Sequence, residues 1–166
     1  DVTEGVGGTG VVAIARNGSG RTVLIRADMD GLPVPERSRL SYASAAKQTD
    51  AAGVEQSVMH ACGHDTHMTA LVGAARQLLA RKSEWRGTVV FIGQPAEETI
   101  SGAKAMIEDG LYTRFPKPEY ALAFHVNAQG EAGKVGVRDD IVYSSSDSVD
   151  IKVRGVGAHG ASPHKG

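Results

Sequence analysis

The chain has 166 residues, a formal net charge of −1 and a single cysteine, with 41% hydrophobic and 22% charged residues, a composition typical of a globular domain large enough to bury a core. The low net charge gives no reason to expect nucleic acid or a membrane surface as a partner, and no apolar run approaches the roughly 18 residues that span a bilayer. One cysteine excludes an internal disulfide and fits a reducing compartment, so we expect a cytoplasmic protein.

The first predicted elements are strands. Residues 10–16 and 22–26 are apolar and rich in β-branched side chains, with Asn-Gly-Ser-Gly close between them. This pattern predicts a β-hairpin closed by a glycine turn. The second stretch runs into Asp28 and Asp30, so two acids follow the end of a strand. Residues 35–57 are polar and aperiodic, which indicates a loop.

Helices and strands alternate further along the chain. Apolar residues recur at helical spacing over 65–82, and Asp65 or Thr66 is a candidate cap. The elements predicted next are a strand at 87–92, a helix at 101–109 ended by Gly110, and strands at 120–126 and 134–138. This order predicts an α/β fold in which helices cover a mixed sheet.

The last part of the chain changes character. Residues 149–154 alternate between apolar and polar side chains, which predicts a strand with one face in water. We therefore expect a second domain to begin near Ser145. The chain starts at Asp1 without an initiator methionine and stops at Gly166 without a closing element, so we expect a fragment of a longer protein.

Residues 60–67, His-Ala-Cys-Gly-His-Asp-Thr-His, contain three of the six histidines and the only thiol. Thiolate and imidazole suit zinc and other late divalent metals. Further candidate ligands follow predicted strands, and because sites in open α/β sheets lie at the carboxyl ends of strands, we expect them to converge on one edge. They are Asp28 and Asp30, the pair Glu97-Glu98, and His125.

Each of these residues alone has a simpler explanation. Adjacent glutamates such as Glu97-Glu98 usually lie in solvated loops, and a lone Cys62 is more often a small buried hydrophobe. If all of these simpler explanations held at once, however, the positions of such residues after successive predicted strands would be a coincidence. Two adjacent acids can also divide labour at a metal site, since one coordinates while the other accepts a proton from water.

Five motifs, taken together, resemble one family. They are RADMDGLP at 26–33, MHACGHDTHM at 59–68, QPAEE at 94–98, AFHV at 123–126 and GVGAHGASPH at 155–164. In this order, over nearly the whole chain, they resemble the metal-dependent amidohydrolases of the aminoacylase/carboxypeptidase clan, and most closely its branch of hippurate hydrolases and plant indoleacetyl–amino acid hydrolases. The resemblance implies a partial zinc-exopeptidase-like catalytic domain at 1–144. It implies the start of an inserted α+β lid and dimerisation domain at 145–166.

The resemblance also implies roles for particular side chains. Glu97 would be the general base that activates water, and Asp30 would orient a ligand. His159, in the lid, would help to hold the substrate and the developing oxyanion. Two divalent metal ions (Zn, Mn, Co or Ni) would be held by Cys62, His64, Glu98 and His125.

The chain departs from the clan's pattern in two places. The wider clan has His-x-Asp where this chain has Asp28 and Asp30, and Cys62 replaces the lost ligand as in the branch named above. The clan also takes a last histidine ligand from near its C-terminus, so we expect residues 1–166 alone to bind metal poorly and to hydrolyse nothing. Packing or hydrogen bonding to the ligands is the expectation for the remaining polar residues, His60, Asp65 and His67.

For the full-length protein the resemblance implies metal-dependent hydrolysis of the amide bond of N-acyl amino acids by a homodimer. The alternatives within the clan are a dipeptidase and an N-acetyl-diaminopimelate deacetylase, and the alternative outside catalysis is a metal- or ligand-binding protein on the same fold. Cys62 could instead be a nucleophile activated by a histidine. The glycines of residues 5–10 fit a dinucleotide-binding pattern, but a β-rich segment follows them where that pattern needs a helix, so a turn is favoured.

Overall fold

The computed structural model describes residues 1–141, 147, 149–152, 154–157 and 159–165. The chain divides into two compact units, Asp1–Ala128 and Gln129–Gly166. Among the described residues, no helix combines the length and the apolar character needed to cross a membrane.

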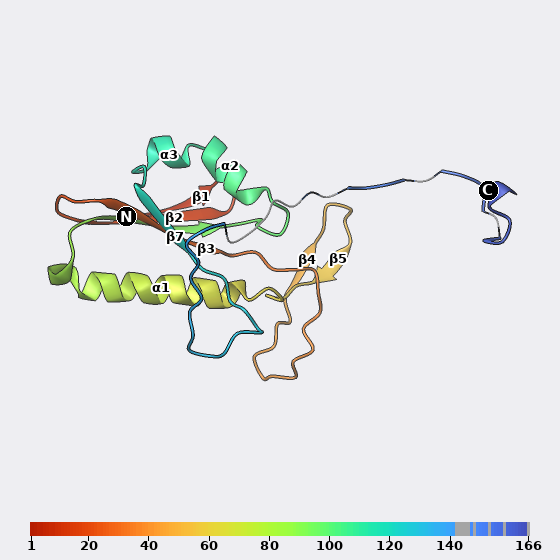
Figure 1. The fold of residues 1–166 in the computed structure, drawn as a ribbon, viewed down its shortest axis with the longest axis horizontal. Coiled ribbons are helices and arrows are strands. Elements are labelled where there is room, and N and C mark those ends of the chain that lie inside the picture. The colour runs from red at the N-terminus through yellow and green to blue at the C-terminus, as the bar shows by residue number, and fades with distance from the viewer. Residues whose placement is uncertain (142–146, 148, 153, 158, 166) are drawn as a thin grey trace. The chain divides into compact units, whose positions relative to one another are not determined.

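The first unit is built on a five-stranded mixed sheet with the strand order β1-β2-β6-β3-β7. The strands are β1 (Val2–Val6), β2 (Gly10–Asn17), β3 (Thr22–Asp28), β6 (Gly87–Gln94) and β7 (Tyr120–Ala123). The helices are α1 (His64–Ala80), α2 (Gly102–Glu108) and α3 (Leu111–Arg114), and a short 3₁₀ helix, η1, spans Lys82–Glu84. Helix α1 lies on one face of the sheet, and α2 and α3 lie on the other (Figure 1). The predicted α/β fold with helices covering a mixed sheet is confirmed.

Strand β6 organises both halves of the core. Successive side chains of a strand point to opposite faces of the sheet, and β6 is apolar on both. Val90 and Ile92 belong to the buried cluster that contains Met106 of α2. Val89 and Phe91 belong to the cluster packed against α1. A strand buried on both faces has to be central, which explains the continuous apolar run over 87–92.

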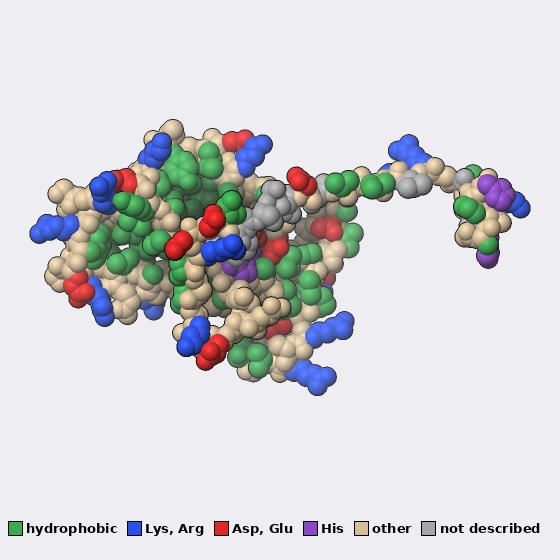
Figure 2. Space-filling view, in the orientation of Figure 1, with side chains coloured by type: hydrophobic (Ala, Val, Ile, Leu, Met, Phe, Trp, Pro, Cys, Tyr) green, Lys and Arg blue, Asp and Glu red, His purple; other side chains and the backbone are tan. Residues whose placement is uncertain are grey.

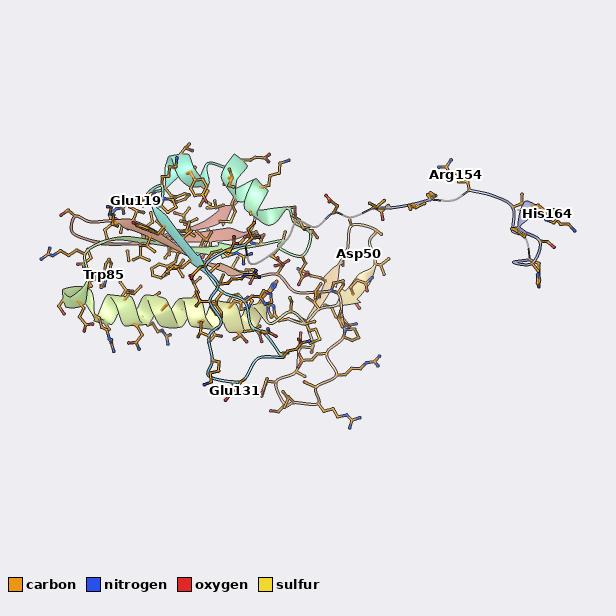
Figure 3. The ribbon with its side chains drawn as sticks, in the orientation of Figure 1. Asp50, Trp85, Glu119, Glu131, Arg154 and His164 are labelled. Carbon is orange, nitrogen blue, oxygen red and sulfur yellow. The ribbon has the colours of Figure 1, made fainter. Side chains whose placement is uncertain are left out.

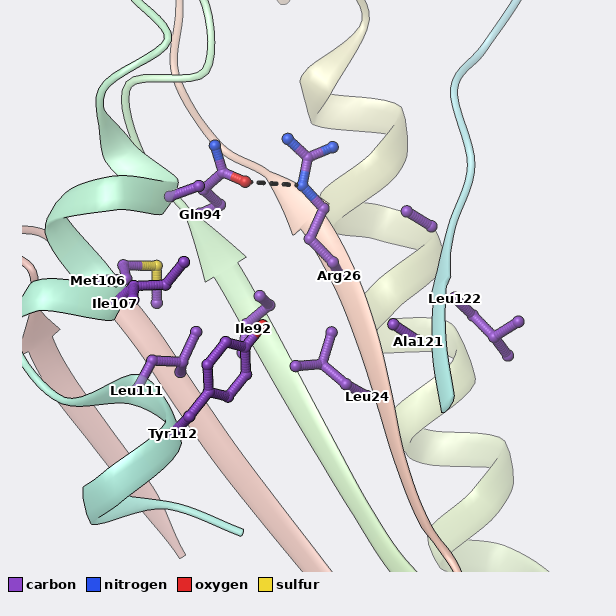
Figure 4. Close-up of a pocket in the computed structure, with 12 residues that line it drawn as sticks. Leu24, Arg26, Ile92, Gln94, Met106, Ile107, Leu111, Tyr112, Ala121 and Leu122 are labelled. Carbon is purple, nitrogen blue, oxygen red and sulfur yellow. Dashed lines mark hydrogen bonds between the residues drawn. The ribbon is translucent and has the colours of Figure 1, made fainter. Parts of the chain in front are cut away.

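A small cavity of about 260 Å³ lies between α2, α3 and strands β3, β6 and β7 (Figure 4). Its walls are mostly apolar, and hydrophobic side chains gather on this face of the first unit around α3 and β7 (Figure 2). At one end of the cavity the side chains of Arg26 and Gln94 meet, with Arg26 Nε donating to Gln94 Oε1 at 3.0 Å.

The hairpin predicted from residues 10–16 and 22–26 is wrong. β6 lies between the two strands, antiparallel to β2 and parallel to β3. A turn signal between two strands cannot reveal that a later, more apolar strand will take the central place. The true hairpin precedes them, because β1 pairs with β2. The turn between these strands contains Gly7 and Gly8, with φ of 64° and 104°, so the glycine run is a turn, as favoured above.

Two local features near the predicted site differ from expectation. Helix α1 begins at His64, and its cap is Gly63, with φ of 79° and no side-chain cap hydrogen bond, rather than Asp65 or Thr66. Within the predicted loop 35–57, β4 (Lys47–Thr49) and β5 (Glu55–Ser57) form a two-stranded antiparallel sheet. Such short polar strands carry no hydrophobic alternation that the sequence could reveal.

The end of the chain contains less regular structure than predicted. β7 stops at Ala123, three residues before the predicted end. No strand is present at 134–138, and of the strand predicted at 149–154 the described residues 149–152 and 154 are irregular. Val153 and the predicted domain start near Ser145 lie outside the described residues. The one regular element described in the second unit is a short 3₁₀ helix, η2, at Pro163–Lys165.

Candidate metal centre

Side chains from four segments meet at one edge of the sheet. Strands β3, β6 and β7 run parallel, so their carboxyl ends share that edge, where ligand sites of open α/β sheets form. Asp28 ends β3, and His64 begins α1 with its Nε2 3.7 Å from Asp28 Oδ2. The structure thus brings the predicted site residues of the first unit together, while their roles stay predictions.

His64 presents a buried nitrogen that no described residue satisfies with a hydrogen bond. Its Nδ1 lies 2.9 Å from the carbonyl oxygen of Asp30, and because a carbonyl only accepts, Nδ1 carries the proton. Nε2 therefore holds a lone pair, and among the described residues it has no hydrogen-bond partner. It lies 3.7 Å from Glu98 Oε1 and 3.9 Å from Glu97 Oε2. A buried lone pair facing carboxylates is a feature that a bound cation would satisfy.

His125 and Cys62 complete the cluster from the other side. His125 Nδ1 lies 2.7 Å from the carbonyl oxygen of Val126, so it donates there and leaves the Nε2 lone pair available. That Nε2 is 3.5 Å from Cys62 Sγ. One donor atom from each of Cys62, His64 and His125 lies within 4.8 Å of the others, and the same holds for His64, Glu97 and Glu98. The two groups share His64 and contain all four predicted ligands, and their donor types fit a late divalent metal.

Asp30 connects these segments. Its Oδ2 accepts a hydrogen bond from the backbone N–H of Glu98 at 2.9 Å, and its carbonyl accepts one from His64. Its other carboxylate oxygen, Oδ1, is buried without a hydrogen bond among the described residues, 3.2 Å from His64 Nδ1. Asp30 therefore touches two predicted ligands without belonging to either cluster, an arrangement compatible with the predicted orienting role.

The loop that carries Glu97 and Glu98 is tightly closed. The N–H of Ser101 donates to the carbonyl of Ala96 at 3.2 Å. Ala96 and Ile100 have φ of 50° and 55°, a left-handed conformation that costs a residue with a side chain about 1–2 kcal/mol. Backbone strain of this kind clusters at functional sites, and here it borders the two adjacent glutamates after β6.

The sequence did not reveal the partnership of Asp28 and His67. Both side chains are buried, and His67 Nδ1 lies 2.5 Å from Asp28 Oδ1. Burial alone would raise the pKa of Asp28, but the His67 hydrogen bond and the charge of Arg26 hold it below its ordinary value. The spacing of three residues from His64 places His67 on the same face of α1, which is the one sequence signal that pointed here.

Asp28, His64 and His67 also lie close enough to hold an ion, but the hydrogen bonds argue against that cluster. His67 Nε2 accepts the backbone N–H of Val126 at 3.0 Å, while its Nδ1 faces Asp28. Both ring nitrogens are therefore used within the protein. His67 has no lone pair left for a metal.

The surroundings of Cys62 disfavour a nucleophilic role. Burial, with contributions from Glu98, Glu97 and Asp28, raises the pKa of Cys62 to about 11. A cysteine nucleophile needs a lowered pKa, so the contact with His125 does not make a reactive pair here. A divalent cation among the same carboxylates would reverse the local charge and favour the thiolate.

His159, predicted to act in the lid, belongs to the second unit. Its Nδ1 accepts a hydrogen bond from the N–H of Ala161 at 3.2 Å within that unit. Its predicted contact with substrate stays a prediction.

Comparison with known proteins adds relatives to this geometry. Residues 24–163 match peptidase family M20/M25/M40. Hippurate hydrolase of Campylobacter jejuni is 40% identical over 166 residues, which cover 99% of this chain and 40% of that protein. Thermostable carboxypeptidase 2 of Saccharolobus solfataricus is 40% identical over 169 residues, with the same two coverages. This chain spans about 40% of the length of these relatives.

A solved structure shares the fold. It is the YXEP protein of Bacillus subtilis, described as a dinuclear metal-binding peptidase of the M20 family. It superposes with a TM-score of 0.66 at 34% identity, over 78% of this chain and 33% of its own. The family match extends over most of the sequence and agrees with its five motifs, and this chain therefore belongs to peptidase family M20/M25/M40.

Proposed function

We propose that the complete protein is a metal-dependent amidohydrolase that cleaves the amide bond of N-acyl amino acids. The observation that carries the proposal is the buried Nε2 of His64, which has no hydrogen-bond partner in the described part of the chain and faces Glu97 and Glu98 beside Cys62. The similarity to a hippurate hydrolase supports the substrate class, because hippurate is an N-acyl amino acid.

In this proposal two divalent ions, chosen among Zn, Mn, Co and Ni, are held by Cys62, His64, Glu98 and His125. Bound ions of this kind would acidify a water molecule and polarise the amide carbonyl. The description of the Bacillus subtilis structure as a dinuclear metal-binding peptidase supports the number of ions. The free lone pairs of His64 and His125 support the choice of ligand atoms.

The two adjacent glutamates divide the work. The side chain of Glu98 is 26% exposed and that of Glu97 is 38% exposed, so Glu97 is the one more open to water. Glu97 takes the proton from the attacking water and gives it to the leaving amine. Asp30 keeps Glu98 and His64 in place through its two hydrogen bonds.

Space for a substrate adjoins the cluster. A cavity of about 840 Å³ reaches Asp30 and Glu98, and its walls include Met29, Leu32 and Val58. An apolar wall next to the predicted metal centre suits the acyl part of the substrate. Residues 145–166 begin the lid and dimerisation domain in this proposal, and His159 contributes to holding the substrate and the oxyanion in the homodimer.

The test is a Glu97→Gln variant in a protein of the relatives' full length, assayed with hippurate. We expect unchanged metal content and a loss of turnover of about 10²–10⁴-fold, the range for general acid–base groups. Glu108→Gln, an exposed glutamate of α2 that pairs with Lys104, is the matched control and should behave like the wild type. Turnover close to wild type in Glu97→Gln would exclude Glu97 as the base.

A peptidase activity is the second candidate, because the carboxypeptidase relative is as similar as the hippurate hydrolase. The ratio of hippurate to dipeptide hydrolysis by the same preparation decides between them. Both activities should disappear together in Glu97→Gln, since the water-activating chemistry is shared.

A further inference from the structure

We infer that His67 is a positioning residue: held by the buried carboxylate of Asp28, it fixes the backbone of Val126 and thereby sets the place of His125. The inference rests on the proposed role of His125 as a metal ligand. It adds a function for Asp28 and His67, neither of which is needed as a ligand itself.

The hydrogen bonds define the state of His67. The N–H of Val126 can only donate, so His67 Nε2, 3.0 Å away, is the acceptor. In a neutral imidazole the proton then sits on Nδ1, which donates to Asp28 Oδ1 at 2.5 Å. The orientation of the ring is fixed at both nitrogens. His67 therefore acts only through the residues it holds.

The segment that carries His125 needs such an anchor. Strand β7 ends at Ala123, whose pairing with Arg26 is the last described contact of the ladder between β7 and β3. Beyond that point no described strand pairing holds residues 124–126. The ring of His67 contacts all three: its centroid lies 5.2 Å from that of Phe124 and 4.6 Å from that of His125, besides the bond to Val126.

Packing supports the same segment from the turn before α1. Gly63 has φ of 79°, and a Cβ added to it would lie 2.5 Å from Val126 Cγ2, so glycine lets these two segments of the chain approach closely. Gly63 stands between Cys62 and His64, which together with His125 form one of the groups of candidate metal ligands. Val126 is thus pressed against the turn that carries two ligands while His67 holds its N–H.

Asp28 is itself anchored to the sheet. Its Oδ2 accepts a hydrogen bond from Arg26 Nη1 at 2.8 Å, and Arg26 Nε donates to Gln94 Oε1 (Figure 4). The contacts run without interruption from β6 through β3 and α1 to the segment after β7. The network joins the ends of all three parallel strands, so His125 is positioned relative to the ligands on the other elements.

The experiment compares two substitutions of His67 in a protein of the relatives' full length. In His67→Asn the amide can still donate to Asp28 but is too short to reach Val126. In His67→Gln the amide oxygen can reach the Val126 N–H. Asn17→Ala is the matched control, because the half-buried Asn17 donates to the backbone carbonyls of Lys82 and Trp85 at the other end of the sheet.

Two readouts separate positioning from general destabilisation. The first is Co²⁺ titration, with the visible spectrum of the bound ion as the signature of its ligands. We expect His67→Asn to weaken Co²⁺ binding 10–100-fold and to alter the spectrum. His67→Gln should recover most of the affinity, and Asn17→Ala should match the wild type. The second is hydrogen exchange in the metal-free protein, where the Val126 amide should exchange at least tenfold faster in His67→Asn while amides of β6 stay protected.

The outcomes distinguish this inference from the proposed function. If the wild type binds Co²⁺ and His67→Asn gives the same affinity and spectrum, the positioning role is wrong while the metal centre stands. If the wild type itself binds no Co²⁺, both are wrong. Should His67→Asn fail to fold, the wild type still decides, because a Val126 amide that exchanges as fast as an exposed amide overturns the inference.

Discussion

The two ends of the central sheet use polar groups in opposite ways. At the end near Trp85 and Glu119 (Figure 3), Asn17 Nδ2 lies 2.6 Å from the carbonyls of Lys82 and Trp85, and the Trp85 indole donates to Leu78. Every one of these groups satisfies another. At the carboxyl end, His64 Nε2 is instead buried without a hydrogen-bond partner among the described residues.

The difference separates stability from function. Protein interiors rarely tolerate a buried polar atom without a partner, because leaving it unsatisfied costs about 1–3 kcal/mol. We call the end near Trp85 and Glu119 the closed end, and the carboxyl end of β3, β6 and β7 the open end. At the closed end each of these hydrogen bonds connects neighbouring parts of the chain and stabilises the fold. At the carboxyl end, Asp30 accepts a hydrogen bond from the backbone of Glu98 and Asp28 accepts one from the His67 ring, so both acids hold other residues in place. The free-energy cost of an unsatisfied buried atom is thus found at the carboxyl edge of the sheet, where a bound ligand would offset it.

The largest effect is expected when the unsatisfied atom is removed. In His64→Asn the amide can still donate to the Asp30 carbonyl, but the predicted ligand nitrogen is lost. We expect Zn²⁺ affinity of the full-length protein to fall by more than about a hundredfold, since loss of a ligand exceeds the 10–100-fold cost of losing a supporting contact. Hippurate turnover should fall with it, while the melting temperature of the metal-free protein changes little. Isothermal titration with Zn²⁺ measures the affinity, and a wild-type value would remove His64 from the site.

The next effect concerns Asp28, whose folded pKa lies below its ordinary value. Its contribution to stability is therefore fully present above the unfolded pKa of about 3.9 and is lost as the pH falls through the lower folded value. Asp28→Asn removes the charged partner of the half-buried Arg26, so unfolding should require about 1.5–3 kcal/mol less at neutral pH, the range for hydrogen bonds to charged groups. Urea unfolding between pH 7 and pH 2 should show a constant difference between the two proteins above about pH 4 and convergence below it, as the pH falls through the folded pKa of Asp28. A constant difference across that range would contradict the charged role of Asp28.

Much of this contrast could be predicted from the sequence, and the failures have physical causes. Glu97 and His125 could be placed after strands from the sequence, because the apolar composition of β6 and β7 predicts both strands locally. The sequence does not reveal that β6 lies between β2 and β3, since a turn between neighbouring antiparallel strands and a turn that skips one strand both use glycine and asparagine. The bond between His67 and Val126 joins residues 59 positions apart, and no periodicity encodes such a distance.

The reactivity of Cys62 gives a third test of the open end. Its pKa of about 11 means that the thiolate fraction near neutral pH is about a hundredfold smaller than for a thiol two pKa units lower. We expect iodoacetamide to react slowly with the metal-free protein at pH 7.5 and the rate to keep rising with pH beyond pH 9. Activity should also be lost on chelation. A rate that levels off near pH 7, irrespective of metal, would favour the nucleophile over the ligand.

The smallest effect is expected at the closed end, where it should reach stability alone. Asn17→Ala removes two hydrogen bonds of 2.6 Å that tie β2 to the turn after α1. Two neutral hydrogen bonds contribute about 1–3 kcal/mol together, which thermal unfolding of the metal-free protein resolves. Zn²⁺ affinity and hippurate turnover should stay at wild-type values, because the hydrogen bonds of Asn17 and Trp85 connect residues at this end alone. A simultaneous loss of metal binding would mean that the sheet transmits strain from one end to the other. The closed end would then contribute to the predicted metal centre and not to stability alone.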